Sequence, residues 1–295
     1  MARRKYTLRD SPFFRLRSKG KLARVLQVSP AKLKKLAHLE GGYIQFQKPK
    51  KKGGSRDISA PIPPLKSVQS RISDLLGRVA PPDYLFAPVE GRSYVDNAAR
   101  HIGARTVRLL DIEDFFPSCT IKKVIWFFRS HMECSADVAV ILARIVTHNG
   151  VLPQGSPCSP ILAYFAYVDM WEEIDGLVSG ARCKLSVYAD DLTISGETVP
   201  ESMIWEIKKT LYRHGHRYAV HKERARRDRA TEITGVILTR EGVTVPNRQR
   251  QKIHTVREHL KVAKSPKQAK HFEAQLRGRL AQLRQIHAGN ALSDS

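Results

Sequence analysis

The sequence predicts an α+β fold, and three observations carry this prediction. Apolar residues recur at three- and four-residue spacing in several segments, as they do on the buried face of a helix. The runs at 106–112 and 184–196 are instead short, apolar and rich in β-branched residues, which is typical of strands. In mid-chain the order strand, helix, helix, strand–turn–strand, helix, strand gives an α+β core, with helical and hairpin additions at each end.

The N-terminal part predicts helices around one hairpin. Residues 21–39 show helical spacing that is interrupted at Ser29 and Pro30, which predicts two helices with Ser29 capping the second. Residues 41–62 alternate apolar and polar positions, which predicts a hairpin with a lysine-rich tip. Residues 65–80 then predict an amphipathic helix that ends before two prolines.

The middle of the chain predicts a strand that delivers an acidic side chain. Residues 106–112 form this strand, and Asp111 lies at its end. Further strands are expected in the 184–196 hairpin and at 217–221, 231–238 and 242–245. Helices are expected at 121–131, at 136–150 with a stop at Asn149 and Gly150, at 161–180, at 200–214 and, strongly basic, at 248–263 and 266–287.

The composition indicates an anionic partner. The 295 residues include 51 Lys and Arg against 28 Asp and Glu, a formal net charge of +23. A chain of this length can bury a substantial core, and a field of this size steers nucleic acids and makes their binding depend on salt. A ribosomal-type scaffold or a membrane-surface protein has similar charge, so composition alone leaves these alternatives open.

Cysteine usage and hydropathy indicate a cytoplasmic protein. Cys119, Cys134, Cys158 and Cys183 are isolated, without the spacing of a disulfide framework or a zinc site, which fits a reducing compartment. No stretch approaches the roughly 20 apolar residues that span a bilayer, and the N-terminus lacks the apolar centre of a signal peptide. We therefore expect a soluble chain with no membrane partner.

The segment KLSVYADDLTISG, residues 184–196, places Asp190 and Asp191 side by side at a hairpin tip. Adjacent carboxylates repel each other unless a cation neutralises them, and magnesium binds such oxygens together with substrate phosphates. Two ions about 3.5–4 Å apart need a further carboxylate. Antiparallel pairing of the 106–112 strand with the hairpin would supply Asp111. The alternative is that both aspartates cap a solvated turn.

Two neighbouring segments favour the metal site. LLDIEDFFPS places Phe115 and Phe116 after its acidic residues, and LPQGSPCSP places a rigid turn with Gln154 before a helix. One of the two phenylalanines is expected in the core. A ring five residues after Asp111 can instead lie against the sugar of an incoming nucleotide, where its bulk would exclude a 2′-hydroxyl.

These segments, in this order and at these separations, resemble the palm of reverse transcriptases. DIEDFF resembles the first palm motif, LPQGSPCSP the second and YADD the metal-binding third. DNAARHIG carries an N-A-x-x-H pattern, and EITGVIL resembles a V-T-G pattern with Ile233 in place of Val. Both patterns occur together in retron reverse transcriptases, bacterial enzymes that make RNA-linked single-stranded DNA. The likeness covers roughly residues 12–245 and is specific.

The resemblance implies a right-hand polymerase with fingers, a palm of antiparallel sheet and helices, and a helical thumb. The thumb is assigned from its position and basic charge, because its helices match no motif. The implied parts are N-terminal helices and fingers hairpin at 1–90, first part of the palm at 91–119, fingers helices at 120–150, palm with the YADD hairpin at 151–245, and thumb at 246–295.

For the catalytic centre, the resemblance implies two Mg²⁺ ions held at a site made of Asp111, Ile112, Asp190 and Asp191. Lys222 falls where polymerases place a lysine that can donate a proton to the leaving pyrophosphate.

For nucleotide binding, Phe116 would be the sugar gate, and Gln154 would contact the nucleotide or the template base beside it. Arg56, with Lys50 or Lys51, would hold the triphosphate. The alternative for the lysines is a solvated loop tip or a nonspecific phosphate patch.

The resemblance also implies contacts to primer and RNA. Tyr188 would support the primer end. His101 has two candidate roles, RNA recognition and holding the local fold; proton transfer is not expected of it. The primer- and RNA-binding set is Tyr188, Asn97, His101, Thr234 and Gly235, with Arg248, Arg250 and Arg277 in the thumb.

The function that the resemblance implies is RNA-directed synthesis of DNA. Deoxynucleoside triphosphates and a cognate structured non-coding RNA (msr-msd) would be used to make RNA-linked single-stranded DNA (msDNA), primed from an internal 2′-hydroxyl of that RNA, within an anti-phage defence retron. An effector or toxin protein is an expected partner. About a hundred residues follow the acidic hairpin, too few for an RNase H domain of ordinary size, so host RNase H is expected to remove template.

Three alternatives remain beside this function: a group II intron-like reverse transcriptase, an untemplated defence-associated polymerase, and an antitoxin scaffold that mainly holds its RNA–DNA product.

Overall fold

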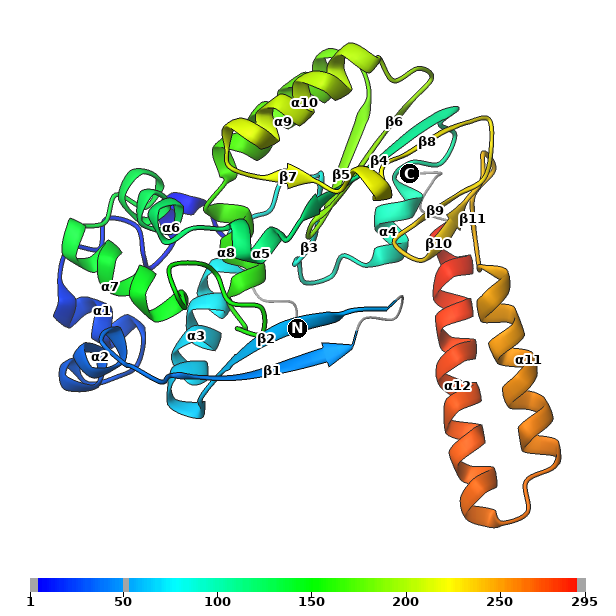
Figure 1. Ribbon diagram of the computed structural model, residues 1–295, viewed down its shortest axis with the longest axis horizontal. Coiled ribbons are helices and arrows are strands. Elements are labelled where there is room, and N and C mark those ends of the chain that lie inside the picture. Colours follow the sequence, from blue (N-terminus) through cyan, green and yellow to red (C-terminus); the bar gives the residue numbers. More distant parts are fainter. Residues whose placement is uncertain (1–4, 50–52, 291–295) are drawn as a thin grey trace.

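The computed structural model describes residues 5–49 and 53–290. Figure 1 shows a central sheet with helices on one side, a long two-stranded hairpin below it, and two C-terminal helices that extend away from the rest of the chain. Among the described residues, no helix is both long and apolar enough to cross a membrane. The four cysteines are free, as expected.

The N-terminal helices pack with a second group of helices from mid-chain. The predicted pair at 21–39 is confirmed as α1 (Lys19–Val25) and α2 (Pro30–Ala37), and the Ser29 hydroxyl accepts a hydrogen bond from the Lys32 amide at 3.2 Å. Their apolar faces join one core with α3, α6 and α7. The bounds of these three helices are Pro63–Leu76, Ile121–Trp126 and Ala136–Val146, and one π-helical turn, Phe127–His131, follows α6.

The predicted hairpin is confirmed as β1 (Tyr43–Pro49) and β2 (Ser55–Pro61), which pair antiparallel with Phe46 opposite Ile58, while the lysines expected at its tip, 50–52, lie outside the described residues. The Ser59 amide donates to the Gln154 carbonyl at 2.8 Å, so this hairpin lies directly against the turn of LPQGSPCSP. Gly155 has φ +129°, and a Cβ there would lie 3.0 Å from the Ser59 carbonyl oxygen. Glycine is therefore required at this contact.

The central sheet has the strand order β3-β5-β6-β4-β7, with β8 also paired to β4. β3 and β5 run parallel and the other pairs are antiparallel. In this register Asp111 lies opposite Asp191. The bounds are β3 Leu85–Ala87, β4 Thr106–Glu113, β5 Lys184–Tyr188, β6 Asp191–Gly196, β7 Arg217–Tyr218 and β8 Arg224–Arg227.

The two faces of this sheet differ in chemistry because side chains alternate along each strand. One face carries buried apolar residues, among them Leu110, Ile112, Leu192 and Ile194, and helices α9 and α10 lie across it (Figure 1). We call it the helix-covered face. Its helices are α8 Ser159–Phe165, α9 Val168–Gly180 and α10 Glu201–Arg213.

The opposite face, which we call the acidic face, carries Asp111 and Asp191 at one end. Further along, the Ser186 and Ser195 hydroxyls bond to the buried ring of His101, just after helix α4 (Tyr94–Ala99). Beside α4 lies a second sheet in the order β11-β10-β9. Its strands are Thr231–Ile233 (β9), Val236–Leu238 (β10) and Val243–Thr244 (β11).

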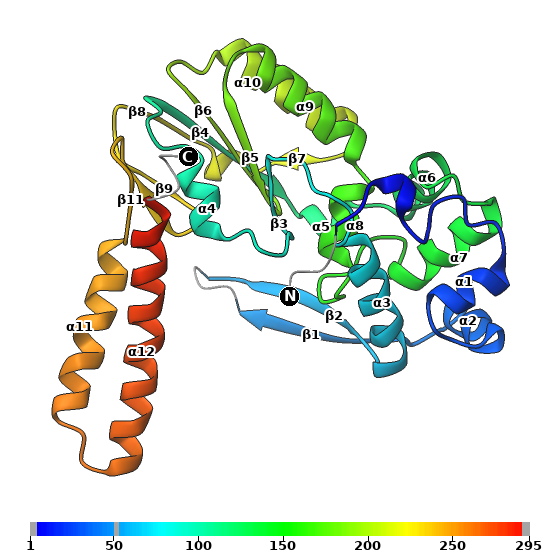
Figure 2. The same ribbon diagram turned by 180° about the vertical axis from the view of Figure 1, so that it is seen from behind.

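The C-terminal helices α11 (Asn247–Lys261) and α12 (Pro266–Ala288) confirm the two predicted basic helices. They form an antiparallel pair that extends away from the rest of the ribbon in both views (Figures 1 and 2). Ile286 is fully buried in the cluster formed by α4 and the second sheet. The Asn290 side chain accepts from the Val243 amide at 2.6 Å and donates to the Val243 carbonyl at 3.2 Å.

Three expected elements were wrong. Of the strand expected at 217–221, only Arg217–Tyr218 (β7) is extended, and Val220–Lys222 forms a 3₁₀ turn instead. Residues 161–180 form α8 and α9 instead of one helix, because Tyr167 leaves the helical conformation and its hydroxyl donates to the Ser118 carbonyl at 2.9 Å. Residues 231–238 form the hairpin β9–β10 instead of one strand. Thr234 and Gly235 both have positive φ, as a two-residue hairpin turn of type I′ requires.

Candidate active site

Three carboxylates meet at the end of the acidic face. Asp111 is the sixth residue of β4, Asp191 is the first residue of β6 and its cross-strand partner, and Asp190 lies in the turn between β5 and β6. The Asp190 carbonyl accepts from the Ile112 amide at 2.9 Å, and the Ala189 amide donates to the Ala87 carbonyl at 3.2 Å. The hairpin tip is therefore fixed to a strand on each side, as the predicted antiparallel pairing required.

The electrostatics of this cluster favour a bound cation. Burial, followed by the charge of Asp111, raises the pKa of Asp190. Burial also raises the pKa of Asp191 to about 7, together with the charges of Asp190 and Asp111 and a hydrogen bond to Asp111. A partly buried group of acids that resists ionisation is stabilised by positive charge placed among its oxygens.

Lys222 supplies one such charge. Its Nζ lies 2.7 Å from Asp111 Oδ1, and the Ala219 amide holds the Asp111 carbonyl at 2.8 Å. Although burial favours the neutral amine, the hydrogen bond and charge of Asp111 raise the pKa of Lys222. The predicted proximity of Lys222 to the acidic centre is therefore present, and its catalytic role stays a prediction.

The donor set fits magnesium by its chemistry, because carboxylate oxygens are the ligands this ion prefers. In this conformation, however, no group of three His, Cys, Asp or Glu side chains in the described ranges is placed to hold a metal ion. Asp111 is bonded instead to Lys222 and to Asp191. A bound cation would compete with Lys222 for Asp111 Oδ1.

Phe115 and Phe116 take the two different positions that the sequence suggested. Asp114 has φ +44° and starts the short helix α5 (Phe115–Ser118). Phe115 is buried against Trp171 and His216, whereas Phe116 is only half-buried beside it. Phe116 is therefore the more accessible of the two rings, and its role as the sugar gate stays a prediction.

The expected nucleotide contacts lie on the hairpin and the turn that it touches. Arg56, on β2, is exposed, and its charge lowers the pKa of Asp190 in opposition to burial, which places it within electrostatic reach of the carboxylates. Gln154 is half-buried beside β2. Lys50 and Lys51 lie outside the described residues.

The two sequence patterns around Asn97 and Thr234 contact each other. Asn97 Nδ2 lies 3.3 Å from Thr234 Oγ1, and Thr234 Oγ1 donates to the Tyr94 carbonyl at 3.0 Å. Gly235 provides the second positive φ of the turn that presents Thr234. Asn97 is 1% exposed and joins α4 to the second sheet, and its expected contact with RNA stays a prediction.

His101 belongs to the same layer and is fully buried. Its Nδ1 lies 2.6 Å from Ser195 Oγ and its Nε2 lies 2.7 Å from Ser186 Oγ. Burial, helped by the charges of Arg100 and Lys184, lowers the pKa of His101 to about 3, so the ring is neutral. Of its two candidate roles, this burial favours that of holding the local fold, and RNA recognition by His101 stays a prediction.

Comparisons with known proteins agree with this geometry. A family model described as reverse transcriptase (RNA-dependent DNA polymerase) matches residues 48–238, a range that contains all three carboxylates and Lys222. The chain belongs to the reverse transcriptase family. This membership confirms the predicted α+β polymerase fold.

Curated relatives of this family member are of the retron type, which confirms the predicted resemblance. The retron Se72 reverse transcriptase of Salmonella heidelberg (strain 579083-10) is 34% identical over 52% of this chain and 41% of that protein. The retron Mx65 reverse transcriptase of Myxococcus xanthus is 32% identical over 66% of this chain and 50% of that protein. The retron Ec86 reverse transcriptase of Escherichia coli is 26% identical over 85% of this chain and 83% of that protein.

The chain thus spans about half or less of the length of two of these reverse transcriptases. Among solved structures, that of the foamy viral protease-reverse transcriptase in complex with RNA/DNA hybrid has a TM-score of 0.44 and 19% identity. The match covers 73% of this chain and 25% of that one.

The remaining residues expected to bind primer or RNA lie at the surface of this family member. Tyr188 is half-buried opposite Asp191 on the acidic face. Arg248 is exposed and paired with Glu232, Arg250 donates to Thr244 at 3.2 Å, and Arg277 is exposed on α12. Their contacts with nucleic acid stay predictions.

Sequence reasoning missed the residues that fix the segment carrying Lys222. Glu223 accepts from the buried Arg108 of β4 at 2.7 Å and from Lys208 of α10 at 2.8 Å. One acid among the basic residues 221–227 was the available signal. The ion pairs hold the chain on the helix-covered face immediately after Lys222.

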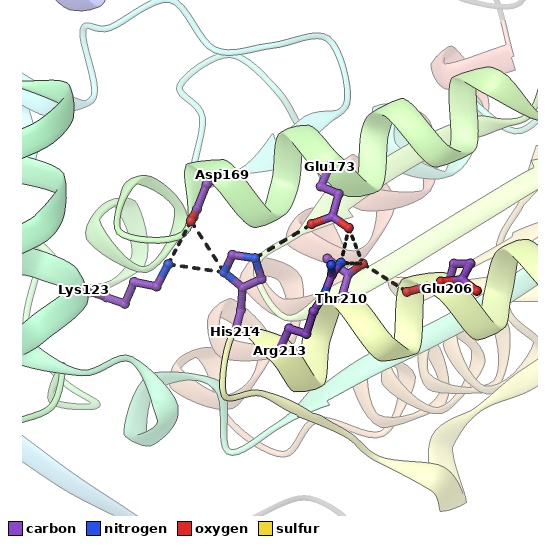
Figure 3. A network of polar contacts seen from close by, with 7 residues as sticks. All are labelled: Lys123, Asp169, Glu173, Glu206, Thr210, Arg213 and His214. Carbon is purple, nitrogen blue, oxygen red and sulfur yellow. Dashed lines mark hydrogen bonds and ion pairs between the residues drawn. The ribbon is translucent and has the colours of Figure 1, made fainter.

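A second polar network connects the helices that lie on the helix-covered face (Figure 3). Lys123 of α6 lies 2.9 Å from Asp169 of α9 and 3.2 Å from His214, at the end of α10. Thr210 donates to Glu173 at 2.9 Å. The network joins the mid-chain helices to α9 and α10, and thereby supports the helix-covered face from behind.

Proposed function

We propose that this chain is an RNA-directed DNA polymerase that copies a structured non-coding RNA into RNA-linked single-stranded DNA. The observation that carries the proposal is the meeting of Asp111, Asp190 and Asp191 with Lys222 at one end of the acidic face. The retron relatives support the kind of product, and the net charge of +23 supports a nucleic acid as partner. A role in anti-phage defence, with an effector protein as partner, is part of the same proposal.

In the proposed mechanism, Asp111, Asp190 and Asp191 would hold two Mg²⁺ ions, with Ile112 fixing the hairpin backbone beside them. Bound magnesium lowers the pKa of an attacking hydroxyl and stabilises the charge on leaving pyrophosphate. Arg56 holds the triphosphate from the β1–β2 hairpin, and Phe116 and Gln154 position the nucleotide. Lys222 donates a proton to the leaving group.

We also propose a division of the chain into the fingers, palm and thumb of a right-hand polymerase. The β1–β2 hairpin and the helices around it are proposed as fingers, the central sheet with α8–α10 as palm, and α11 and α12 as a thumb that grips duplex through backbone charge. The four unpaired cysteines support the reducing environment of the cytoplasm.

The nucleic acid that copurifies with the chain tests the proposed function. We expect an RNA joined covalently to a short DNA, detected as a band that both ribonuclease and deoxyribonuclease shorten. Heterogeneous RNA without attached DNA would contradict the retron-type product, while DNA synthesis on a generic primed RNA would still support polymerase activity.

Replacing the sugar gate, Phe116→Ala, is expected to admit ribonucleotides. Forcing a hydroxyl against a packed ring costs about 1–3 kcal/mol, so discrimination against ribonucleotides should fall about 10- to 100-fold. The measurement is kcat/KM for one deoxynucleotide and its ribonucleotide on the same primed template. Phe116→Tyr keeps the ring as control, and an unchanged preference in Phe116→Ala would remove Phe116 from the gate.

A further inference from the structure

Strand β8 is an edge strand composed largely of arginine. Residues 224–229 read RARRDR, and all of them are exposed. β8 pairs with β4 on one side, and no strand in the described part of the chain pairs with its other edge. Charged edge strands often serve only to prevent pairing with other chains. To distinguish prevention of strand pairing from binding of a ligand, we ask on which face of the sheet each arginine lies.

The register divides the arginines of β8 between the two faces. Arg224 is opposite Leu109 and Arg226 is opposite Val107, so both share the acidic face with Asp111. Arg227 is opposite Thr106, on the helix-covered face. Lys222, which ends a 3₁₀ turn (Val220–Lys222), contacts Asp111, and β8 begins two residues later. A row of cations therefore starts at the carboxylates with Lys222 and continues with Arg224 and Arg226, which lie about 7 Å apart along the strand.

The same residues differ in how their charge is neutralised. Arg227 lies 3.9 Å from Asp228, which Arg105 also holds through two contacts of 3.0 Å. Within the described ranges, Arg224 and Arg226 form no ion pair, and the Arg226 guanidinium bonds only to the neighbouring Ala225 carbonyl at 3.0 Å. Among the three arginines of β8 itself, the two without an ion pair are thus those on the acidic face.

We propose that Arg224 and Arg226 bind the phosphate backbone of a nucleic-acid strand that runs from the catalytic carboxylates along β8. Guanidinium groups suit this partner because they form bidentate, charge-assisted hydrogen bonds with phosphate. Such contacts set the path of the strand without reading its sequence. The inference rests on the proposed function, because it takes the strand to be template or product of the same site.

The test compares two double variants of the full chain that lose equal charge, one from the acidic face of β8 and one from Arg227 on its other face and Arg229 just after the strand. Arg224→Gln/Arg226→Gln removes the pair on the acidic face, and Arg227→Gln/Arg229→Gln is the control. The probe is a labelled RNA–DNA hybrid with a recessed DNA primer, followed by each strand alone, with Kd measured over a series of salt concentrations.

We expect the first variant to bind the hybrid about tenfold or more weakly at low salt, with the slope of log K against log [salt] reduced by about 2, one for each phosphate contact. The control should keep the wild-type slope. If RNA alone shows the same loss of affinity as the hybrid, the strand along β8 is RNA; if DNA alone shows it, the strand is DNA.

If both double variants lose the same affinity for the hybrid, the proposal is overturned, because the loss then reflects overall positive charge and not the position of Arg224 and Arg226. If Arg224→Gln/Arg226→Gln binds the hybrid with unchanged Kd but has a raised KM for deoxynucleotides, the proposal is overturned and the arginines instead bind the incoming triphosphate. If the Kd is unchanged and the oligomeric state changes, the proposal is also overturned, and the arginines serve only to prevent pairing of β8 with other chains. If wild type makes no DNA on the primed template, the proposed function fails, while the binding comparison still decides the role of the arginines.

Discussion

Asp190→Asn abolishes DNA synthesis on a primed RNA template, with an expected fall in rate of at least about 10³-fold. A carboxylate that holds the ions contributes several kcal/mol of transition-state stabilisation, and each 1.4 kcal/mol corresponds to tenfold in rate. An amide has the same shape but no charge to offer a cation. The measurement is single-turnover incorporation of one nucleotide, with Mg²⁺ binding followed separately by calorimetry.

Stability and a matched variant distinguish loss of the site from loss of the fold. Because burial and the charge of Asp111 raise the pKa of Asp190, a neutral Asn relieves repulsion, and the Tm of the metal-free variant should equal or exceed that of wild type. Glu113→Gln removes an exposed carboxylate two residues after Asp111 and should leave synthesis intact. Retained synthesis in Asp190→Asn would remove this residue from the metal site.

Lys222→Gln is expected to slow incorporation by about 10²- to 10⁴-fold, the usual contribution of a positioned general acid. Nucleotide affinity should change much less, because the proton is transferred only as pyrophosphate leaves. The measurement is the maximal single-turnover rate and the apparent nucleotide Kd from one titration series.

A second substitution separates proton donation from simple charge. Lys222→Arg keeps a cation beside Asp111, but a guanidinium does not give up its proton at ordinary pH. If Lys222 is the acid, both variants are slow; if it only neutralises Asp111, Lys222→Arg is fast. Lys209→Gln, an exposed lysine on α10, controls for lost charge, and a wild-type rate in Lys222→Gln would exclude Lys222 from the chemistry.

The sequence predicted those features of the fold that rest on local patterns. The strand of Asp111 could be placed because its residues are apolar and β-branched, and the acidic hairpin because two strand-like runs flank an adjacent Asp pair. Their antiparallel pairing followed from the need to bring carboxylates together, and the register of Asp111 with Asp191 confirms it.

Features that depend on tertiary contacts could not be predicted. The break between α8 and α9 exists because Tyr167 bonds to Ser118, some fifty residues earlier in the chain. β8 has no apolar alternation and is a strand only because β4 offers it an edge. The burial of His101 depends on two serines from the acidic hairpin, so its motif alone could not distinguish an RNA contact from an interior residue.

The base of the C-terminal helical pair limits how that pair can move. α11 follows β11 after Val245 and Pro246, and Asn290, just past α12, is bonded to both backbone groups of Val243 in the same strand. Because both ends of the pair are attached to β11, we expect the two helices to move together and not separately. Because Thr234, in the β9–β10 turn, bonds Asn97 of α4, we expect a nucleic acid bound at the far tips to act through the second sheet on α4, which lies against the acidic face.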